Sequence, residues 1–325
     1  MVELTFPSGA FVSLCPGATQ EAWNAFRLTG LGGSDLPAII GLSPYTSPTE
    51  IWLRKTGQTV PRLDNPVLSE AAEMGHELEP VVARRFSKQT GLPIIENPGT
   101  LRRPDKPHMI VNLDRATIEK GQPGVVELKT RSSYALNDWL DETPVDTTVQ
   151  VMWQLAVTGW QFGYTACLIG GQRTIVHRIQ RDDEVIANLE AIADEFWGWV
   201  ESGIRPPLDG SHATGQLLDR LHANPVDQIV VADAAEVEKW LAIRASAKEQ
   251  IAAADIALTE AENHLKAIAG DSTDVHVRGE LAYTWRRRKG QISWKSAALA
   301  IDPDLDPEPY RGPDTRVLNV PQEHQ

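Results

Sequence analysis

Apolar residues recur at three- and four-residue spacing along much of the N-terminal third of the chain. The longest such stretch covers residues 68–90, and Gly91 follows it as a helix stop. Its length and period predict an amphipathic helix of several turns. Shorter helices with the same period are predicted over residues 19–30, 34–41 and 47–57.

The period then changes from helical to alternating, in short segments rich in β-branched residues and bounded by Pro, Gly and Asp. These segments predict strands, and Gly170-Gly171 between the last two predicts a hairpin turn. Helical spacing returns over residues 147–158 and 182–200. The predicted strands are residues 93–95, 108–113, 125–129, 164–169 and 174–179. Strands interleaved with helices favour an α/β fold.

The C-terminal third differs in composition. Residues 203–232 are predicted to be a linker, because most of this stretch is rich in Pro, Gly and polar residues. Asp233 is a candidate N-cap, and the Ala-, Glu-, Lys- and Leu-rich pattern after it predicts one long helix or a helical hairpin. The sequence therefore predicts a core over residues 1–202, a helical extension with short strands over residues 233–301, and a loose acidic tail over residues 302–325.

Composition narrows the class of protein. The 325 residues are 42% hydrophobic, enough for a sizeable core, and the apolar runs are far shorter than the roughly 18 residues that span a bilayer. The start of the sequence lacks a basic segment followed by a long apolar one, so no secretion signal is expected and a cytosolic protein is predicted. The formal net charge of −13 argues against a surface that binds nucleic acid all over, but it leaves room for a local basic groove.

Cysteine usage limits the kinds of metal site. Cys15 and Cys167 are the two cysteines of the chain, and each is isolated in the sequence. Two thiols cannot form a disulfide framework, or a cysteine-ligated zinc or iron-sulfur centre, within one chain. A bound metal ion would therefore have oxygen or histidine ligands.

The pattern that carries chemistry is Asp114 followed, after twelve intervening residues, by Glu127-Leu128-Lys129. Successive strand residues point to opposite faces, so Glu127 and Lys129 share one face while Leu128 points into the core. If Asp114 ends the preceding strand beside them, two carboxylates converge on a volume that suits Mg²⁺ or Mn²⁺. Such an ion acidifies water and stabilises charge on phosphate, as metal-assisted phosphodiester hydrolysis requires. The alternative interpretation is an exposed strand face that alternates Glu and Lys.

Two neighbouring segments add candidate residues. Glu79 lies on the long predicted helix, from which a third carboxylate could reach the same ion. Gln150 and Gln154 lie one turn apart on the helix over residues 147–158 and therefore share a face. For the two glutamines alone, the spacing favours an exposed helix face over a role in a site.

Several further motifs follow one another in a fixed order between about residue 19 and residue 200. They are residues 32–45, residues 50–57, Gly75-His76-Glu77-Leu78-Glu79-Pro80, Asp114, Glu127-Leu128-Lys129-Thr130 and residues 150–159. In these motifs the sequence resembles the YqaJ-type viral recombinase family, the lambda-type exonucleases of phage recombination systems, within the PD-(D/E)xK nuclease superfamily. The resemblance implies a restriction-endonuclease-like nuclease core, in which helices flank a mixed central sheet.

The resemblance also implies roles for individual residues. Four metal ligands are implied, namely Glu79, Asp114, Glu127 and the backbone carbonyl of Leu128. Lys129 would be the catalytic lysine, and Gln150 would line the site. Arg27 and Ser34 match positions that hold a 5′-phosphate in the family, and an arginine beside a helix N-terminus is a suitable anion site.

The activity implied by the resemblance is that of a Mg²⁺-dependent exonuclease, with Mn²⁺ as a possible substitute. It would degrade the 5′ strand of duplex DNA and leave 3′ overhangs for phage or prophage recombination in a bacterial cytoplasm. The implied partners are double-stranded DNA ends, a single-strand annealing protein and further copies of the chain, because family members are often ring-shaped trimers. The alternatives are a DNA endonuclease on the same fold and a catalytically silent DNA-binding recombination scaffold.

A basic cluster lies outside the resemblance, in the C-terminal extension. It consists of Arg286, Arg287, Arg288 and Lys289. Trp285 and Trp294 flank it, and positive charge beside aromatic side chains is typical of a nucleic-acid contact. The alternative is pairing of the cluster with acidic residues of the same chain, so both interpretations stay open.

Overall fold

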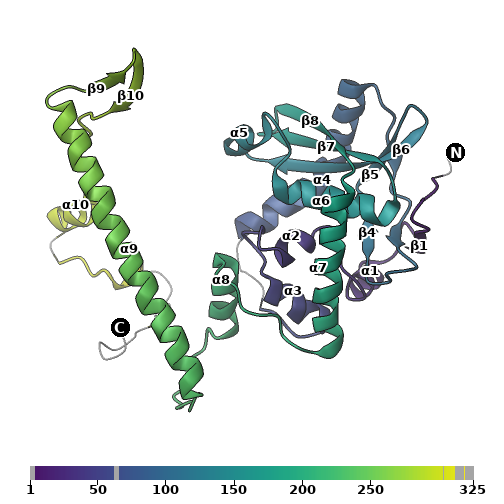
Figure 1. Cartoon of the computed structure of the whole chain (residues 1–325), viewed down its shortest axis with the longest axis horizontal. Coiled ribbons are helices and arrows are strands. Elements are labelled where there is room, and N and C mark those ends of the chain that lie inside the picture. Colours follow the sequence, from purple (N-terminus) through teal and green to yellow (C-terminus); the bar gives the residue numbers. More distant parts are fainter. Residues whose placement is uncertain (1–3, 62–65, 303, 312–317, 319–325) are drawn as a thin grey trace. The chain divides into compact units, whose positions relative to one another are not determined.

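A mixed five-stranded sheet forms the centre of the fold. In this computed structural model the strands lie in the order β2-β5-β6-β7-β8, and β6 and β7 are parallel while the other neighbouring pairs are antiparallel (Figure 1). The strands are β2 (Ile95–Glu96), β5 (Arg115–Glu119), β6 (Gln122–Arg131), β7 (Phe162–Ile169) and β8 (Arg173–Gln180). The prediction of an α/β fold with a mixed central sheet is confirmed.

The described part of the chain consists of residues 4–61, 66–302, 304–311 and 318. The contacts divide the chain into two units, Met1–His222 and Ala223–Gln325, and the five-stranded sheet belongs to the first. Among the described residues, no helix is both long and apolar enough to cross a membrane.

A second, three-stranded antiparallel sheet precedes the central one and leads into it. It has the order β1-β3-β4 and consists of β1 (Phe11–Leu14), β3 (Thr100–Arg102) and β4 (Ile110–Asn112). The chain leaves β4, passes Leu113 and Asp114, and enters β5 of the central sheet. Asp114 therefore lies at the junction of the two sheets. The sequence pattern did not predict β1, β3 or β5, because a three- to five-residue strand is too short to show a clear period.

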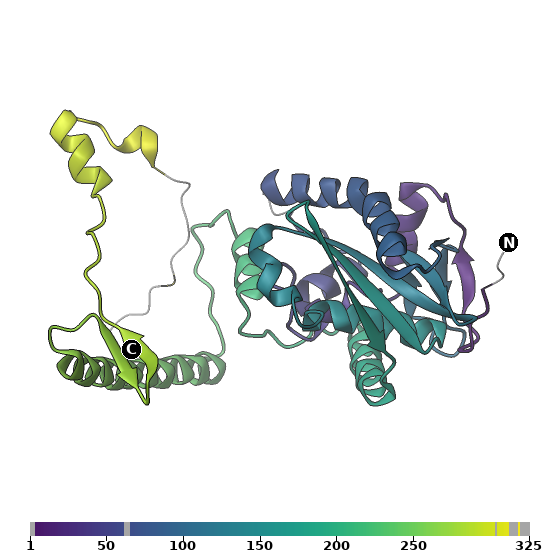
Figure 2. The same cartoon turned by 90° about the horizontal axis from the view of Figure 1, so that it is seen from above.

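Helices cover both faces of the central sheet. The helices of the first unit are α1 (Gln20–Arg27), α2 (Leu36–Ile39), α3 (Pro48–Lys55), α4 (Pro66–Thr90), η1 (Ser133–Ala135), α5 (Leu136–Trp139), α6 (Val145–Thr158), α7 (Asp183–Ser202) and α8 (His212–Leu221). One face is covered by α4 (Figure 2). There, Phe86 of α4 packs in a buried cluster with Val126 and Leu128 of β6. On the other face, Val151 of α6 packs in the main core with Val125 of β6.

Local signals in the sequence set several of the boundaries. The Ser47 hydroxyl caps α3 by accepting the Glu50 backbone N–H at 3.2 Å, as the capping sequence predicts. The turn between β7 and β8 contains Gly170 and Gly171 with φ of 57° and 70°, a left-handed conformation that glycine adopts without strain. The helix predicted over residues 34–41 is much shorter in the structure, where α2 covers four residues.

The structure differs from the predicted linker over residues 203–232. This stretch contains α8, which begins after the N-cap Ser211 and buries Ala213 and Leu217. Arg220 of α8 also forms an ion pair with the buried Glu50 of α3, at 2.6 Å. The first unit therefore extends to His222 rather than to residue 202, because packing on the core outweighs the Pro- and Gly-rich composition around the helix.

The second unit is built around one long helix. Its elements are α9 (Ala234–Ala269), β9 (Asp274–Val277), β10 (Glu280–Thr284), α10 (Trp294–Ile301) and η2 (Glu308–Tyr310). The Asp233 side chain caps α9 by accepting the Glu236 N–H at 2.9 Å, so the predicted helix is present as a single helix and not as a hairpin. β9 and β10 are the predicted short strands, and they pair antiparallel. The predicted loose tail falls largely on residues outside the described part of the chain.

Candidate active site

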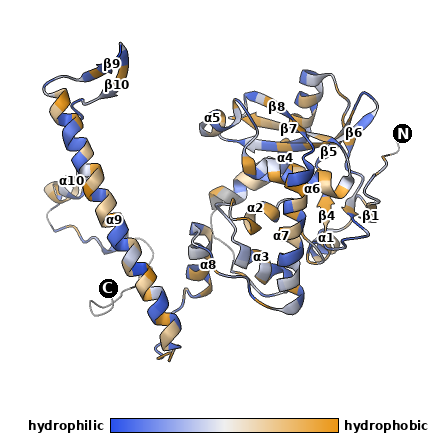
Figure 3. Ribbon diagram, viewed as in Figure 1, coloured by the Kyte–Doolittle hydropathy of each residue, from blue (hydrophilic) through white to orange (hydrophobic). Residues whose placement is uncertain are grey.

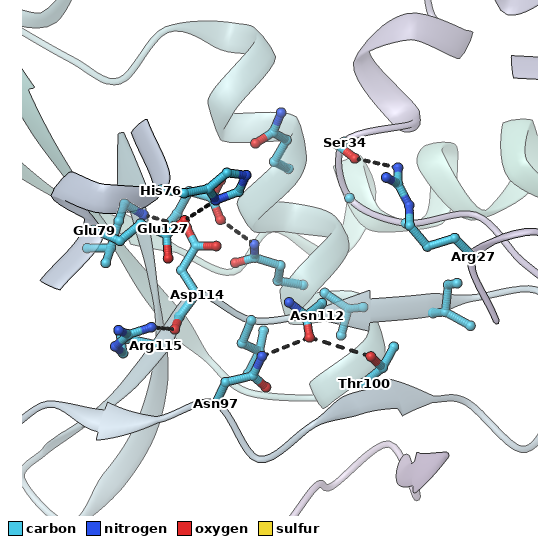
Figure 4. Close-up of a pocket in the computed structure, with 18 of the residues that line it drawn as sticks. Arg27, Ser34, His76, Glu79, Asn97, Thr100, Asn112, Asp114, Arg115 and Glu127 are labelled. Atoms are coloured by element: carbon cyan, nitrogen blue, oxygen red, sulfur yellow. Dashed lines mark hydrogen bonds and ion pairs between the residues drawn. The ribbon is translucent and has the colours of Figure 1, made fainter. Parts of the chain in front are cut away.

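A cavity of about 430 Å³ opens where β6, α4, α6 and the α1–α2 loop meet. The cavity brings together all the residues of the core for which the sequence predicted a role. These residues are Arg27, Ser34, Glu79, Asp114, Glu127, Leu128, Lys129 and Gln150. In Figure 4, Glu79, Asp114 and Glu127 gather on one side of the cavity, and Arg27 and Ser34 lie on the other.

Asp114 is held at the junction between β4 and β5. Its Oδ2 atom accepts the backbone N–H of Leu128 at 2.8 Å, so the hydrogen bond links this junction to the backbone of β6. Burial raises the pKa of the Asp114 carboxyl well above its ordinary value, and the nearby charges of Glu127 and Glu79 raise it further. The charge of Lys129 and the Leu128 N–H act in the opposite direction without cancelling this rise.

Glu127 and Lys129 project from β6 toward α6, where both glutamines lie. The Lys129 ammonium donates to Glu127 Oε1 at 2.5 Å and to Gln150 Oε1 at 2.7 Å, and Gln154 Nε2 donates to Glu127 Oε2 at 2.5 Å. The Leu128 side chain points to the opposite face and is buried in the cluster beneath α4. The alternation predicted for this strand is therefore present, and its polar face is a hydrogen-bonded part of a cavity rather than an exposed surface.

Lys129 is positioned to stay positively charged. Burial lowers its pKa, but the charges of Glu127 and Asp114, together with the hydrogen bond to Glu127, outweigh burial and raise it above the ordinary value. A lysine in this state can stabilise negative charge or orient a polar group, but it cannot accept a proton near neutral pH.

Glu79 lies on α4 at the rim of the same cavity. Its Oε1 atom is 3.0 Å from Nδ1 of His76, and its side chain is 28% exposed. Its charge raises the pKa of Asp114, so the two carboxylates lie within electrostatic reach of each other. The structure thus places Glu79 beside the Asp114–Glu127 pair, as the resemblance implied, but with a histidine as its direct partner.

The donor set suits a hard divalent cation. Among the described residues, no group of three or more His, Cys, Asp and Glu side chains is close enough to hold a metal ion. Mg²⁺ is commonly bound through only one or two carboxylates, with waters completing its octahedron. Burial, and after it the charge of Glu127, raises the pKa of Asp114, and a bound cation would offset the repulsion between the two carboxylates. The residues present therefore fit such an ion.

Arg27 and Ser34 form a second polar pair across the cavity. The Arg27 guanidinium lies 3.5 Å from Ser34 Oγ and 3.5 Å from a carboxylate oxygen of Asp35. It also lies over the Trp23 ring, 4.8 Å from the ring centroid. Both contacts to oxygen are long and the guanidinium is partly exposed, so Arg27 can still bind an anion in the cavity.

A buried ion pair fixes the loop that carries Ser34. Lys55 Nζ lies 2.8 Å from Asp35 Oδ2 and donates to the backbone carbonyl of Arg27 at 2.7 Å. Asp35 Oδ2 also accepts the backbone N–H of Gly32, at 2.9 Å. Burial lowers the pKa of Lys55, although the charge of Asp35 opposes this shift. The Lys55–Asp35 ion pair therefore links α1, α3 and the loop before α2, directly behind Arg27 and Ser34.

Removing one partner of this ion pair is expected to destabilise the fold. Lys55→Met leaves the Asp35 carboxylate buried without its main counter-charge, and we expect a loss of about 3 kcal/mol in urea denaturation. The double variant Asp35→Asn/Lys55→Met is the control, because it removes both charges and should recover much of the loss. Equal stability of the single variant and the wild type would show that the pair does not hold this loop.

Sequence reasoning missed several polar residues of the cavity. Gln154 is 4% exposed and binds Glu127, so the interpretation of the two glutamines as an exposed helix face is wrong. Their four-residue spacing was the available signal, since it places both on the face that carries the site. Asn97 donates to Asn112 Oδ1 at 2.7 Å on the wall formed by the small sheet (Figure 4), and no sequence pattern indicated this pair.

The basic cluster lies in the second unit, directly after β10. Arg286 forms an ion pair with Asp274 of β9, whose Oδ1 atom lies 2.5 Å from Nη2. Arg287, Arg288 and Lys289 are exposed, and so is Trp294. Pairing within the chain is therefore present for Arg286, while the side chains of the other three cations are exposed.

The comparisons with known proteins agree with the resemblance in the sequence. Residues 22–161, which include most of the cavity, match the model of the YqaJ-like viral recombinase domain. The chain is also 36% identical to YqaJ of Bacillus subtilis (strain 168), an uncharacterised protein, over 256 residues that cover 76% of this chain and 77% of the relative. The chain belongs to the YqaJ-like viral recombinase family.

Two of the solved structures that are similar to this chain are described as exonucleases. An alkaline exonuclease, LHK-Exo from Laribacter hongkongensis, is 22% identical with a TM-score of 0.47, and the match covers 57% of this chain and 94% of that one. A phage-related exonuclease from Haemophilus somnus 129PT is 13% identical with a TM-score of 0.39, covering 56% and 98%. The family assignment rests on the sequence matches, because TM-scores below 0.5 are too low to support it.

Proposed function

We propose that this protein is a divalent-metal-dependent deoxyribonuclease that degrades the 5′ strand of duplex DNA from its ends and leaves 3′ overhangs for recombination. The observation that carries the proposal is the presence, in one cavity, of the Asp114–Glu127–Lys129 group and the Arg27–Ser34 pair. The first group has the residues that phosphodiester hydrolysis needs, and the second has the residues that bind a phosphate. Membership in a family of viral recombinases supports a role in recombination.

The carboxylates would hold the metal ion of this reaction. Asp114, Glu127 and the backbone carbonyl of Leu128 are the proposed ligands, with Glu79 at the rim as a further carboxylate. Mg²⁺ or Mn²⁺ bound there supplies the Lewis acidity that polarises a phosphodiester and acidifies water. The Leu128 N–H orients Asp114, and Gln154 orients Glu127, so the chain itself fixes both carboxylates before a ligand arrives.

Lys129 contributes a fixed positive charge to the same step. Its ammonium lies between Glu127 and Gln150, and its raised pKa keeps it protonated. We propose that it stabilises the negative charge that develops on the phosphate and holds the attacking water by hydrogen bonding. Gln150 would fix the direction of the ammonium through its Oε1 atom.

The test of the proposal compares DNA substrates under metal control. Linear and circular duplexes, with the linear one labelled at either its 5′ or its 3′ end, are incubated with the full chain in Mg²⁺, in Mn²⁺ and in EDTA. We expect the linear DNA to lose its 5′ label in Mg²⁺ or Mn²⁺. The label should be retained in EDTA, and the circular DNA should stay intact under all conditions. Cleavage of circular DNA would instead indicate an endonuclease, and binding without cleavage would indicate a scaffold.

The Arg27–Ser34 pair predicts a preference for phosphorylated ends. Arg27→Ala should slow degradation of 5′-phosphorylated DNA by about tenfold to a hundredfold, because a charge-assisted hydrogen bond contributes roughly 1.5 to 3 kcal/mol. Its rate on 5′-hydroxyl ends should change little, so the difference between the two ends should disappear. An unchanged preference in the variant would contradict the assignment of this pair to the phosphate.

The basic cluster predicts a salt-dependent contribution to DNA binding. Replacing Arg287, Arg288 and Lys289 by Gln removes three exposed cations and should reduce the slope of log K against log salt by about 2.7 for duplex DNA. Arg286→Gln alone is the matched control, because the Arg286 side chain is already paired with Asp274. An unchanged slope in the triple variant would assign the cluster to folding or to a protein partner.

A further inference from the structure

Within the described part of the second unit, the long helix α9 has very little contact with the other elements. Of its 36 residues, Ala269 at the C-terminal end is the one that the structure shows as buried. The β9–β10 hairpin contacts this end, where the Tyr283 hydroxyl donates to the Leu265 carbonyl at 2.8 Å. The remainder of the helix is exposed or half-buried, including large apolar side chains such as Trp240, Ile251 and Leu258.

These apolar residues form a continuous stripe. In Figure 3, hydrophobic and hydrophilic residues alternate along the whole of α9. Positions three and four residues apart form two series that repeat every seven residues, as in a coiled coil. The first series is Val237, Arg244, Ile251, Leu258 and Leu265, and the second is Trp240, Ala247, Ala254, Ala261 and Ile268. Apart from Arg244, every member is apolar, so the stripe has the pattern of a surface that packs against another helix.

We propose that the α9 stripe pairs with the same stripe of a second copy of the chain, as an antiparallel two-stranded coiled coil. The two-fold axis would pass between Ala252 and Ala253. In this register each member of the first series faces a member of the second series on the other copy, and no position is left without a partner.

The sizes of the side chains fit this register. Ile251 would face the partner's Ala254, and Leu258 would face the partner's Ala247, so a large residue meets a small one on each side of the axis. Farther out, Arg244 would face the partner's Ala261 and extend past it toward solvent. A large side chain opposite an alanine fills the space that the alanine leaves, so the two helices can approach closely without voids.

A parallel pair in register fits much less well. It would place Arg244 against the partner's Arg244 inside the interface, where two like charges repel each other. It would also stack Ala247, Ala254 and Ala261 on themselves, which leaves every second layer in the middle of the helix underpacked. These defects disappear when one helix is reversed.

Charges beside the stripe support the antiparallel arrangement. Lys248 and Asp255 are both exposed and lie on the same edge of the stripe, seven residues apart. In an antiparallel pair the same edges of the two helices meet, which brings Lys248 close to the partner's Asp255 twice, once on each side of the axis. The charge pattern is therefore complementary to itself in this orientation.

Cysteine cross-linking of the full chain tests both the pairing and its direction. On a Cys15→Ser background, which removes the exposed native thiol, Val237→Cys and Ile268→Cys proteins are prepared separately, one with a larger tag, then mixed and oxidised. The proposal expects the mixed covalent dimer as the main product and little product from either protein alone. The cross-link reports on the helix pair whatever assembly the first unit forms.

Two outcomes would overturn the proposal. Covalent dimers from Val237→Cys protein alone would indicate a parallel pair, and no cross-link in the mixture would leave the stripe to a partner of another kind. The control is Ala242→Cys mixed with Ile268→Cys, because Ala242 lies on the outer face of the helix. A cross-link in this mixture as strong as in the test pair would show random collision.

A charge exchange tests the register without any cysteine. Lys248→Asp alone places like charges at both contacts and should weaken association by roughly tenfold, equivalent to about 1.4 kcal/mol. The double variant Lys248→Asp/Asp255→Lys restores opposite charges and should recover the affinity. A double variant as weak as the single one would contradict the pairing of these two positions.

Discussion

Asp114→Asn and Glu127→Gln are each expected to reduce DNA cleavage by more than about 10³-fold, which corresponds to about 4 kcal/mol in the activation barrier. Each substitution removes one of the two carboxylates that we propose as metal ligands, while the amide keeps nearly the same shape. In the Asp114→Asn variant the amide oxygen can still accept the Leu128 N–H, so the fold should persist. Initial rates on linear duplex DNA at saturating Mg²⁺ measure the effect.

Thermal unfolding separates a lost metal site from a damaged fold. Burial and the charge of Glu127 raise the pKa of Asp114 in the folded state. The free energy of unfolding therefore falls as the pH rises above about 3.9, the pKa of an aspartate in the unfolded chain, because the folded state must then hold an unfavourable buried charge. In EDTA at neutral pH, Asp114→Asn should therefore unfold at the same or a higher temperature than the wild type. Mg²⁺ should raise the Tm of the wild type and leave that of the variant unchanged. Activity of the variant within a few-fold of wild type would contradict the metal assignment.

The half of the site that lies on β6 could be predicted from the sequence, because the two-residue period of a strand fixes which side chains share a face. Glu127 and Lys129 lie together for this reason, and Leu128 lies opposite them. The contact of Asp114 with the Leu128 N–H could not be predicted in the same way. It depends on how sharply the chain turns between β4 and β5, which is a property of the two sheets and not of the local sequence.

Tertiary packing decided the features that the sequence left open or misassigned. The spacing of Gln150 and Gln154 fixed their common face, but only the packing of α6 against the sheet buries that face. Similarly, α8 has a helical pattern within a Pro- and Gly-rich stretch, and it is stabilised by burial of Leu217 and by the ion pair of Arg220 with Glu50. Contacts between residues so far apart in the sequence cannot be predicted from local composition.

The two units also differ in how far their polar and apolar side chains find partners within the unit. In the first unit, strand β6 is covered by α4 on one face and by α6 on the other, and its polar residues find partners in the cavity. In the second unit, α9 exposes apolar residues such as Ile251 and Leu258 over most of its length. The polar residues of β6 therefore find their partners within the first unit, whereas the apolar side chains of α9 stay exposed in the described part of the second unit.

Lys129→Met is expected to lower kcat by about 10² to 10³-fold while leaving KM for DNA nearly unchanged. Methionine has a similar length but no charge, so the variant loses stabilisation of the charge that develops during cleavage and keeps the packing beside Gln150. DNA binding in Ca²⁺ and the Mg²⁺-induced rise in Tm should persist, because neither depends on the ammonium. Lys88→Ala, which removes an exposed lysine of α4, is the control and should have no effect.

The pH profile gives an independent measure of the same residue. Since the carboxylates of Glu127 and Asp114 raise the pKa of Lys129 above its usual value of about 10.4, the wild-type rate should not fall between about pH 7 and pH 9 through loss of its proton. A lysine that acted as a general base would behave in the opposite way, because its activity would rise as the proton is lost. A rate that climbs steadily over this range in the wild type, but not in Lys129→Met, would therefore replace the electrostatic role with a proton-transfer role.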